Sequence, residues 1–131
     1  MGGTILANNL ARRLSGELEQ GSSKITMLSA TDKHMYQPGL LYVAVGKMST
    51  TELYRDQKSL LEPSIDFHVD PVEKFDMDNN SVTTKSGKKI SYDILCIATG
   101  SRGNAAGIPG LAENACQFYT EADALAMYKK L

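Results

Sequence analysis

Several residue types and patterns are scarce in this sequence, and each scarcity excludes a class of protein. Two cysteines are too few for a disulfide framework, which favours a reducing, cytoplasmic location. No apolar run approaches the roughly 18 to 20 residues of a membrane span, and no signal peptide opens the chain. A net charge of −1 without a basic run argues against nucleic-acid binding. The histidines His34 and His68 lie far apart without a Cys-x-x-Cys motif, so we expect no metal site. The lack of a membrane span leads us to expect a soluble chain.

The residues that are present suit one globular domain. At 131 residues, 42% hydrophobic and 22% charged, the chain is long enough to bury a core. Leucines recur every four residues from Leu6 to Leu18, which predicts an amphipathic helix that ends near Gly21. Residues 24–29 then predict a strand.

A short apolar run near the middle of the second half predicts another strand. Residues 94–98 form an uninterrupted run of strand length, as expected of a parallel strand buried on both faces, and Cys96 within it is expected to be buried. The small residues Thr99 and Gly100 follow, at the strand end where open α/β sheets bring ligands. An ordinary exit from a strand into a loop explains the same residues.

The intervening segments carry turn and capping signals. Ser49 and Glu52 match a capping box and predict a helix that stops before Pro63, and Thr120 predicts a second capped helix near the end. Between them the texture changes to short strands separated by turn residues, which predicts a small antiparallel meander. Its expected strands are residues 67–69, 72–77, 82–84 and 89–92.

Three segments in a fixed order resemble one family. Gly2-Gly3 with Ala7 four residues later resembles the tail of the G-x-G-x-x-G dinucleotide fingerprint. The segment 34–46, which contains Tyr36-Gln37-Pro38, is similar to the loop after the second strand in sulfide:quinone oxidoreductases. Tyr92-Asp93 followed by apolar residues and Ala98-Thr99-Gly100 is shared more widely, by flavoproteins with two dinucleotide-binding domains. The chain therefore resembles the N-terminal part of a sulfide:quinone oxidoreductase-like flavoprotein.

This resemblance implies an α/β fold, a partial Rossmann-type FAD-binding half-domain with a small antiparallel β-meander. The chain begins at the position of the third fingerprint glycine, so the first strand is expected to be missing. Residues 1–131 would then be an incomplete FAD/NAD(P)-binding domain, a fragment with negligible turnover by itself. The resemblance implies FAD as the cofactor and assigns it eight residues: Gly2, Gly3, Ser29, Pro38, Val72, Ala98, Thr99 and Gly100.

The same resemblance implies the chemistry of the longer enzyme. Sulfide or a related donor reduces FAD, quinone reoxidises it, and the enzyme sits peripherally on the inner face of the cell membrane through parts outside this chain. Cys116 is the candidate redox cysteine, although matching the last helix to the family places the family's cysteine at Tyr119. Ser29 stands where the fingerprint has an acidic residue that binds the ribose, and Asp32 is a possible substitute.

Two other functions fit the sequence. A type II NADH dehydrogenase shares the wider motifs and would need a second nucleotide-binding domain. A non-enzymatic domain is the other alternative, in which an open strand edge pairs with a second copy to give a homodimer.

Overall fold

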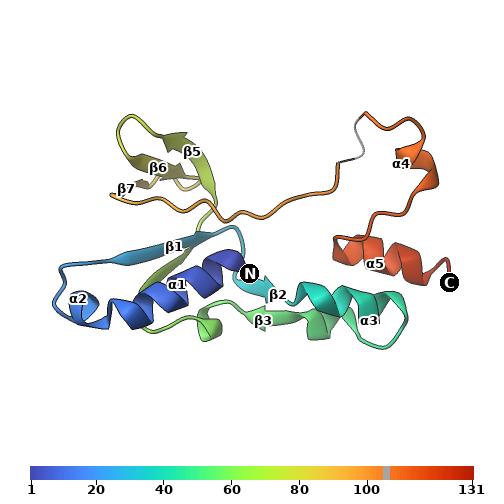
Figure 1. Ribbon diagram of the computed structural model, residues 1–131, viewed down its shortest axis with the longest axis horizontal. Helices are drawn as coiled ribbons and strands as arrows, with labels where there is room; N and C mark the ends of the chain where they lie inside the picture. Colours follow the sequence, from blue (N-terminus) through green and yellow to red (C-terminus); the bar gives the residue numbers. More distant parts are fainter. Residues whose placement is uncertain (105–106) are drawn as a thin grey trace. The chain divides into compact units, whose positions relative to one another are not determined.

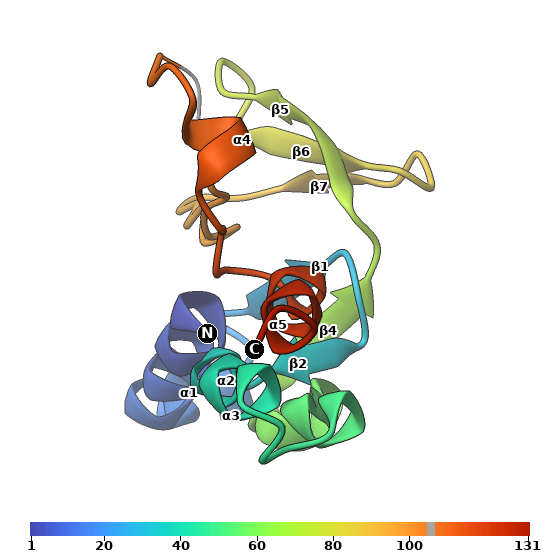
Figure 2. The same cartoon turned by 90° about the vertical axis from the view of Figure 1, so that its right-hand side faces the viewer.

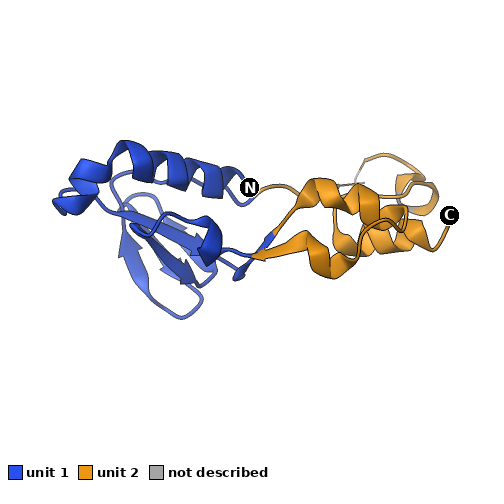
Figure 3. Ribbon diagram, turned by 90° about the horizontal axis from the view of Figure 1, so that it is seen from below, with its two compact units in different colours: residues 1–34, 56–99 blue, residues 35–55, 100–131 orange. Residues whose placement is uncertain are grey.

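The structure is a computed structural model that describes residues 1–104 and 107–131. The chain divides into two compact units, coloured separately in Figure 3. Unit 1 contains residues 1–34 and 56–99, and unit 2 contains residues 35–55 and 100–131. Strand β2 (Lys33–Met35) leads out of unit 1, strand β3 (Tyr54–Asp56) leads back, and the two strands pair with each other.

The centre of unit 1 is a parallel pair of strands. Strand β1 (Ile25–Ser29) confirms the strand predicted after the first helix, and it pairs with β4 (Ile65–Val69) from Ile25 opposite Ile65 to Ser29 opposite Val69. The prediction that residues 67–69 belong to the antiparallel meander is therefore wrong. Short strands of either kind have the same sequence texture, and only the tertiary partner distinguishes them.

Helix α1 (Gly2–Arg13) packs against this pair through its small residues. Ala7 and Ala11 are buried in a cluster with Ile65, whereas Leu6 and Leu10 are each 38% exposed. The predicted helix is confirmed, but its leucine stripe is not its most buried face. Small side chains let the helix axis approach the strands closely, which leaves the leucines on its flanks. The helix breaks at Leu14, and α2 (Ser15–Glu19) ends before Gly21, whose φ is +72°.

The antiparallel meander is confirmed for three of its four strands. Strands β5 (Val72–Asp76), β6 (Ser81–Thr84) and β7 (Lys89–Ser91) form one sheet with β6 in the middle, as Figure 2 shows. A bulge shifts the register between Val72 and Lys74. Together with the helices and the parallel pair, this sheet gives the mixed α/β fold that the sequence predicts.

The apolar segment 94–98 differs from its prediction. It is not a strand, Ile94 is 91% exposed and Ile97 is 56% exposed. Cys96 is exposed as well, so both expectations for this run are wrong. A strand needs a neighbour to bond its backbone groups, and among the described residues the parallel sheet contains β1 and β4 alone. An apolar run reports that a segment can be buried, but it does not supply the partner.

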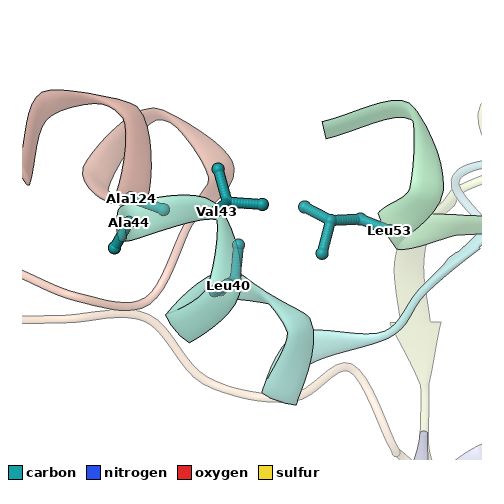
Figure 4. Packing of buried hydrophobic residues seen from close by; sticks show 5 residues of the cluster. All are labelled: Leu40, Val43, Ala44, Leu53 and Ala124. Carbon is teal, nitrogen blue, oxygen red and sulfur yellow. The ribbon is translucent and has the colours of Figure 1, made fainter. Parts of the chain in front are cut away.

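Unit 2 is built mainly from short helices. The turn η1 (Gln37–Gly39) leads directly into α3 (Leu40–Ala44), and α5 (Glu121–Tyr128) packs beside α3. The short α4 (Leu111–Asn114) precedes α5. Figure 4 shows the buried cluster that holds this unit together, formed by Leu40, Val43, Ala44, Leu53 and Ala124.

Both capping boxes are present, but only one begins an α-helix. Thr120 accepts a hydrogen bond from the Asp123 N–H and caps α5, as predicted. Ser49 forms its box with Glu52 at the start of η2 (Thr50–Leu53), and the chain then enters β3 and the turn η3 (Lys58–Leu60). The helix predicted to run to Pro63 is therefore wrong, because residues 54–56 pair with β2 instead of continuing the helix.

Candidate functional site

The first turn of α1 and the carboxyl end of β1 lie at the same end of unit 1, because the helix and the strand run in opposite directions (Figure 1). The first N–H groups of a helix have no acceptor within it, and the helix dipole adds partial positive charge there. In α1 these groups belong to Gly2, Gly3 and Thr4, and the first turn contains no acidic residue to compete for them. This arrangement suits an anionic group such as a diphosphate.

Gly3 brings α1 close to the segment that follows the meander. A Cβ atom added at Gly3 would lie 3.3 Å from the Cβ of Ala98, whereas one added at Gly2 would meet nothing within 4 Å. The predicted site residues Gly3 and Ala98, far apart in the sequence, are therefore in contact within unit 1. A Cβ at Gly3 would be tight against Ala98, and a branched side chain there would require the helix or the segment to shift.

The other predicted residues of unit 1 are placed less specifically. Ser29 ends β1, and its Oγ accepts a hydrogen bond from the Thr31 N–H at 3.3 Å. The side chain of Asp32 lies 3.7 Å from the Lys33 Nζ, so its charge already has a partner. Val72 begins β5 opposite Thr84, and Thr99 is exposed. None of these contacts prevents a role in binding a ligand.

A buried amide near this end of unit 1 was not predicted from the sequence. Gln57 is 4% exposed, and its Nε2 donates a hydrogen bond to the Thr4 Oγ1 at 3.1 Å. Its Oε1 lies 3.0 Å from the Nδ1 of His34, in β2. Its backbone N–H also donates to the Asp32 carbonyl at 2.7 Å. His34 is half-buried in this network.

The remaining predicted cofactor residues lie in unit 2. Pro38 is within η1, and Gly100 has a φ of +80°, a left-handed conformation that favours glycine. Next to Gly100, the Ser101 hydroxyl donates to the Tyr119 hydroxyl oxygen at 2.9 Å. This bond, together with one from the Gln37 side chain, lowers the pKa of Tyr119 from its ordinary value. Tyr119 thus connects the two segments of unit 2 that the sequence assigned to the flavin.

The candidate redox cysteine is accessible. Cys116 is exposed, and the Nζ of Lys130 lies 3.4 Å from its sulfur. Tyr119, the position predicted for the family's cysteine from the start of the last helix, has no sulfur. Cys116 is therefore the thiol nearest in sequence to that position.

The histidines His34 and His68 contact different partners in unit 1. Within residues 1–104 and 107–131, no group of three or more His, Cys, Asp or Glu side chains is arranged to hold a metal ion. His68 instead lies 2.9 Å from Asp66, which also contacts the Lys24 ammonium at 2.7 Å. The hydrogen bond from Lys24, followed by that from His68, lowers the pKa of Asp66.

Comparison with known proteins relates this geometry to one family. The family model described as pyridine nucleotide-disulphide oxidoreductase matches residues 1–131. The sulfide-quinone reductase of Aquifex aeolicus is 36% identical over 132 residues, which cover 100% of this chain and 29% of that protein. The mitochondrial sulfide:quinone oxidoreductase of Mus musculus is 30% identical over 112 residues, covering 86% of this chain and 24% of that protein.

Solved structures agree with these matches. The crystal structure of the Aquifex aeolicus sulfide:quinone oxidoreductase superposes with a TM-score of 0.74 at 32% identity, over 98% of this chain and 29% of that one. The structure of NDH2 from Plasmodium falciparum has a TM-score of 0.62 at 19% identity, over 84% of this chain and 24% of that one, which shows a shared fold. The chain thus spans between 24% and 29% of the length of these relatives.

Proposed function

Because the chain belongs to the pyridine nucleotide-disulphide oxidoreductase family, we propose that it forms the FAD-binding region of a sulfide:quinone oxidoreductase. The observation that carries this proposal is the 36% identity to the Aquifex aeolicus enzyme across the whole of this chain. The family implies a flavin-dependent oxidoreductase, and FAD is the form of flavin that the proposed site suits. The oxidation of sulfide and the reduction of quinone are proposed for the protein as a whole.

The proposed diphosphate site is the first turn of α1. Its free N–H groups, from Gly2 to Thr4, would hold the negative charge of the cofactor. Gly3 supports the site by keeping the helix against Ala98. Ser29, at the end of β1, would contact the ribose through its hydroxyl, and Val72 would lie near the adenine. Two residues of unit 2 would support the flavin: Pro38, in η1, and Gly100, which follows Thr99.

The bound flavin supplies the two-electron chemistry by accepting electrons from a donor and passing them to an acceptor. The protein's part is to hold the cofactor and admit the donor. Cys116, exposed beside Lys130, is the proposed thiol on the sulfide side. Among the described residues no helix is long and apolar enough to cross a membrane. From the similarity to sulfide:quinone oxidoreductases, we propose that contact with membrane quinone is peripheral and uses other parts of the enzyme.

Flavin binding tests the cofactor assignment. We expect FAD to bind the purified chain, and Gly3→Val to weaken this binding because the larger side chain pushes α1 away from Ala98. Gly16→Val is the matched control, since Gly16 is also helical and a Cβ there meets nothing within 4 Å. Equal FAD affinity in the two variants, measured by quenching of flavin fluorescence, would contradict the proposed site.

The electron donor distinguishes the proposed enzyme from a type II NADH dehydrogenase. Anaerobic addition of sulfide should bleach the flavin of the whole protein, and NADH should not. Cys116→Ser should slow this bleaching, with Cys96→Ser as the control, because Cys96 is an exposed thiol elsewhere in the chain. Bleaching by NADH alone would favour the dehydrogenase. A protein that binds no flavin and is a homodimer by light scattering would favour the non-enzymatic alternative.

A further inference from the structure

We infer that Gln57 is a positioning residue of the proposed cofactor site. Its buried amide joins the first turn of α1 to β2 and fixes the tautomer of His34. This inference rests on the proposed function. The amide lies between two groups that are distant in the sequence: Thr4 is 53 residues away and His34 is 23 residues away. Thr4 belongs to the proposed diphosphate turn, and His34 lies four residues before Pro38, which the resemblance assigns to the flavin.

The direction of each hydrogen bond follows from the orientation of the amide. A side-chain amide has one end that only donates and one end that only accepts. The Gln57 Nε2 donates to Thr4, so its Oε1 faces His34 and can only accept. The Nδ1 of His34 must then carry the hydrogen. In the neutral imidazole this leaves Nε2 without a hydrogen and able to accept a hydrogen bond, so the amide determines which nitrogen acts as acceptor.

Burial makes this connection costly to lose. Gln57 is 4% exposed and Thr4 is 8% exposed, so water is a poor substitute for either partner. A buried polar group that loses its partner destabilises its surroundings by more than the bond itself contributed. The backbone N–H of Gln57 is also bonded to Asp32, which fixes the position from which the amide reaches α1. The amide therefore sets where the first turn of the helix lies.

Asn8, in α1, has a side-chain amide that offers a matched comparison with Gln57. The Asn8 Nδ2 donates to the Leu60 carbonyl at 2.7 Å, and its Oδ1 accepts from the Glu62 N–H at 2.9 Å. Asn8 thus also makes two hydrogen bonds between α1 and the segment that follows β3. Asn8 lies about one helical turn farther from the N-terminus of α1 than Thr4 does, and its two hydrogen bonds do not involve His34. Its loss should cost stability without affecting the proposed cofactor site.

The first test is the protonation of His34 in the purified chain, observed by nitrogen-15 NMR at a pH where the imidazole is neutral. The chain has two histidines, and a His68→Gln variant assigns the signals of His34. We expect hydrogen on Nδ1 in the wild type, hydrogen mainly on Nε2 in Gln57→Met, and hydrogen on Nδ1 again in Gln57→Glu, whose carboxylate restores the acceptor. Hydrogen on Nε2 in the wild type would overturn the inference.

The second test measures the site itself in Gln57→Met and Asn8→Leu. Gln57→Met should speed amide hydrogen exchange in the first turn of α1 and weaken FAD binding about tenfold, since two hydrogen bonds of ordinary strength are lost. Asn8→Leu should leave both properties of the folded protein unchanged. Equal effects of the two variants would refute a positioning role. If the wild type bound no FAD, the proposed function would fail, whereas the exchange and the His34 tautomer would still decide the role of Gln57.

Discussion

Replacement of Gly39 by alanine tests how tightly the loop assigned to the flavin is packed. Gly39 ends η1 with φ −64° and ψ −20°, a conformation that alanine adopts easily. An added Cβ would nevertheless lie 2.6 Å from the Leu53 Cδ2 and 3.1 Å from the Met48 sulfur. The first distance is far below van der Waals contact, and Leu53 is 0% exposed, so its side chain has little space in which to move.

Two opposing effects set the expected magnitude. Alanine in place of glycine in a helical conformation stabilises by roughly 0.5–1 kcal/mol. Overpacking of a buried site costs about 1–3 kcal/mol. The net effect of Gly39→Ala should be a loss of about 1 kcal/mol in the free energy of unfolding, since the second effect is larger. Gly16→Ala, in an open helical position, should show only the gain.

Urea unfolding followed by circular dichroism measures both variants. Leu53→Ala alone should cost about 2–5 kcal/mol, as expected when a large buried side chain leaves a cavity. In the double variant Gly39→Ala/Leu53→Ala, the methyl group introduced at position 39 fills part of that cavity. The combined loss in the free energy of unfolding should therefore be smaller than the sum of the two single losses by about 1 kcal/mol. A Gly39→Ala protein as stable as Gly16→Ala, or strictly additive losses in the double variant, would refute the packing argument.

Two further predictions concern titratable groups in unit 2. The Tyr54 hydroxyl donates to the Glu121 carboxylate at 2.6 Å, and this bond raises the pKa of Tyr54 above its ordinary value. The stabilisation of the fold by this hydrogen bond should be complete below pH about 10 and disappear as the pH rises through the raised pKa of Tyr54. Glu121→Gln should remove this dependence of stability on alkaline pH and lower the pKa of Tyr54, measured by the absorbance of its phenolate. The bond from the Thr120 N–H lowers the pKa of Asp123. The stabilisation of α5 should therefore be present above the ordinary aspartate pKa and lost as the pH falls through the lowered one. Asp123→Ala should be less helical than the wild type at neutral pH and equally helical in acid, and a constant difference would contradict the capping role.

The parts of the fold that sequence predicted are those decided by local chemistry. Strand β1, helix α1 and the capped helix α5 follow from hydrophobic spacing and capping residues, and the three strands of the meander follow from turn residues between short apolar runs. The resemblance to sulfide:quinone oxidoreductases was visible at the start of α1 and in two further segments, 34–46 and 92–100. These features depend on residues that are neighbours in the sequence, where a single pattern contains the relevant information.

The parts that sequence missed depend on a distant partner. The apolar run at 94–98 has the composition of a buried strand, but its state depends on a neighbouring edge. Residues 54–56 leave a helical pattern because β2 offers them a partner. Gln57 is one polar residue among many in the sequence, and only the fold brings its amide to Thr4 and His34. A glutamine that is predicted to be buried would have been the one available signal.

The amount of flavin that each chain retains shows whether this chain binds FAD. The purified chain is incubated with excess FAD, freed of unbound cofactor, and examined by its visible absorption spectrum. Our account predicts flavin bands at one FAD per folded chain. A folded chain that remains colourless at cofactor concentrations well above those that saturate flavoenzymes would contradict it.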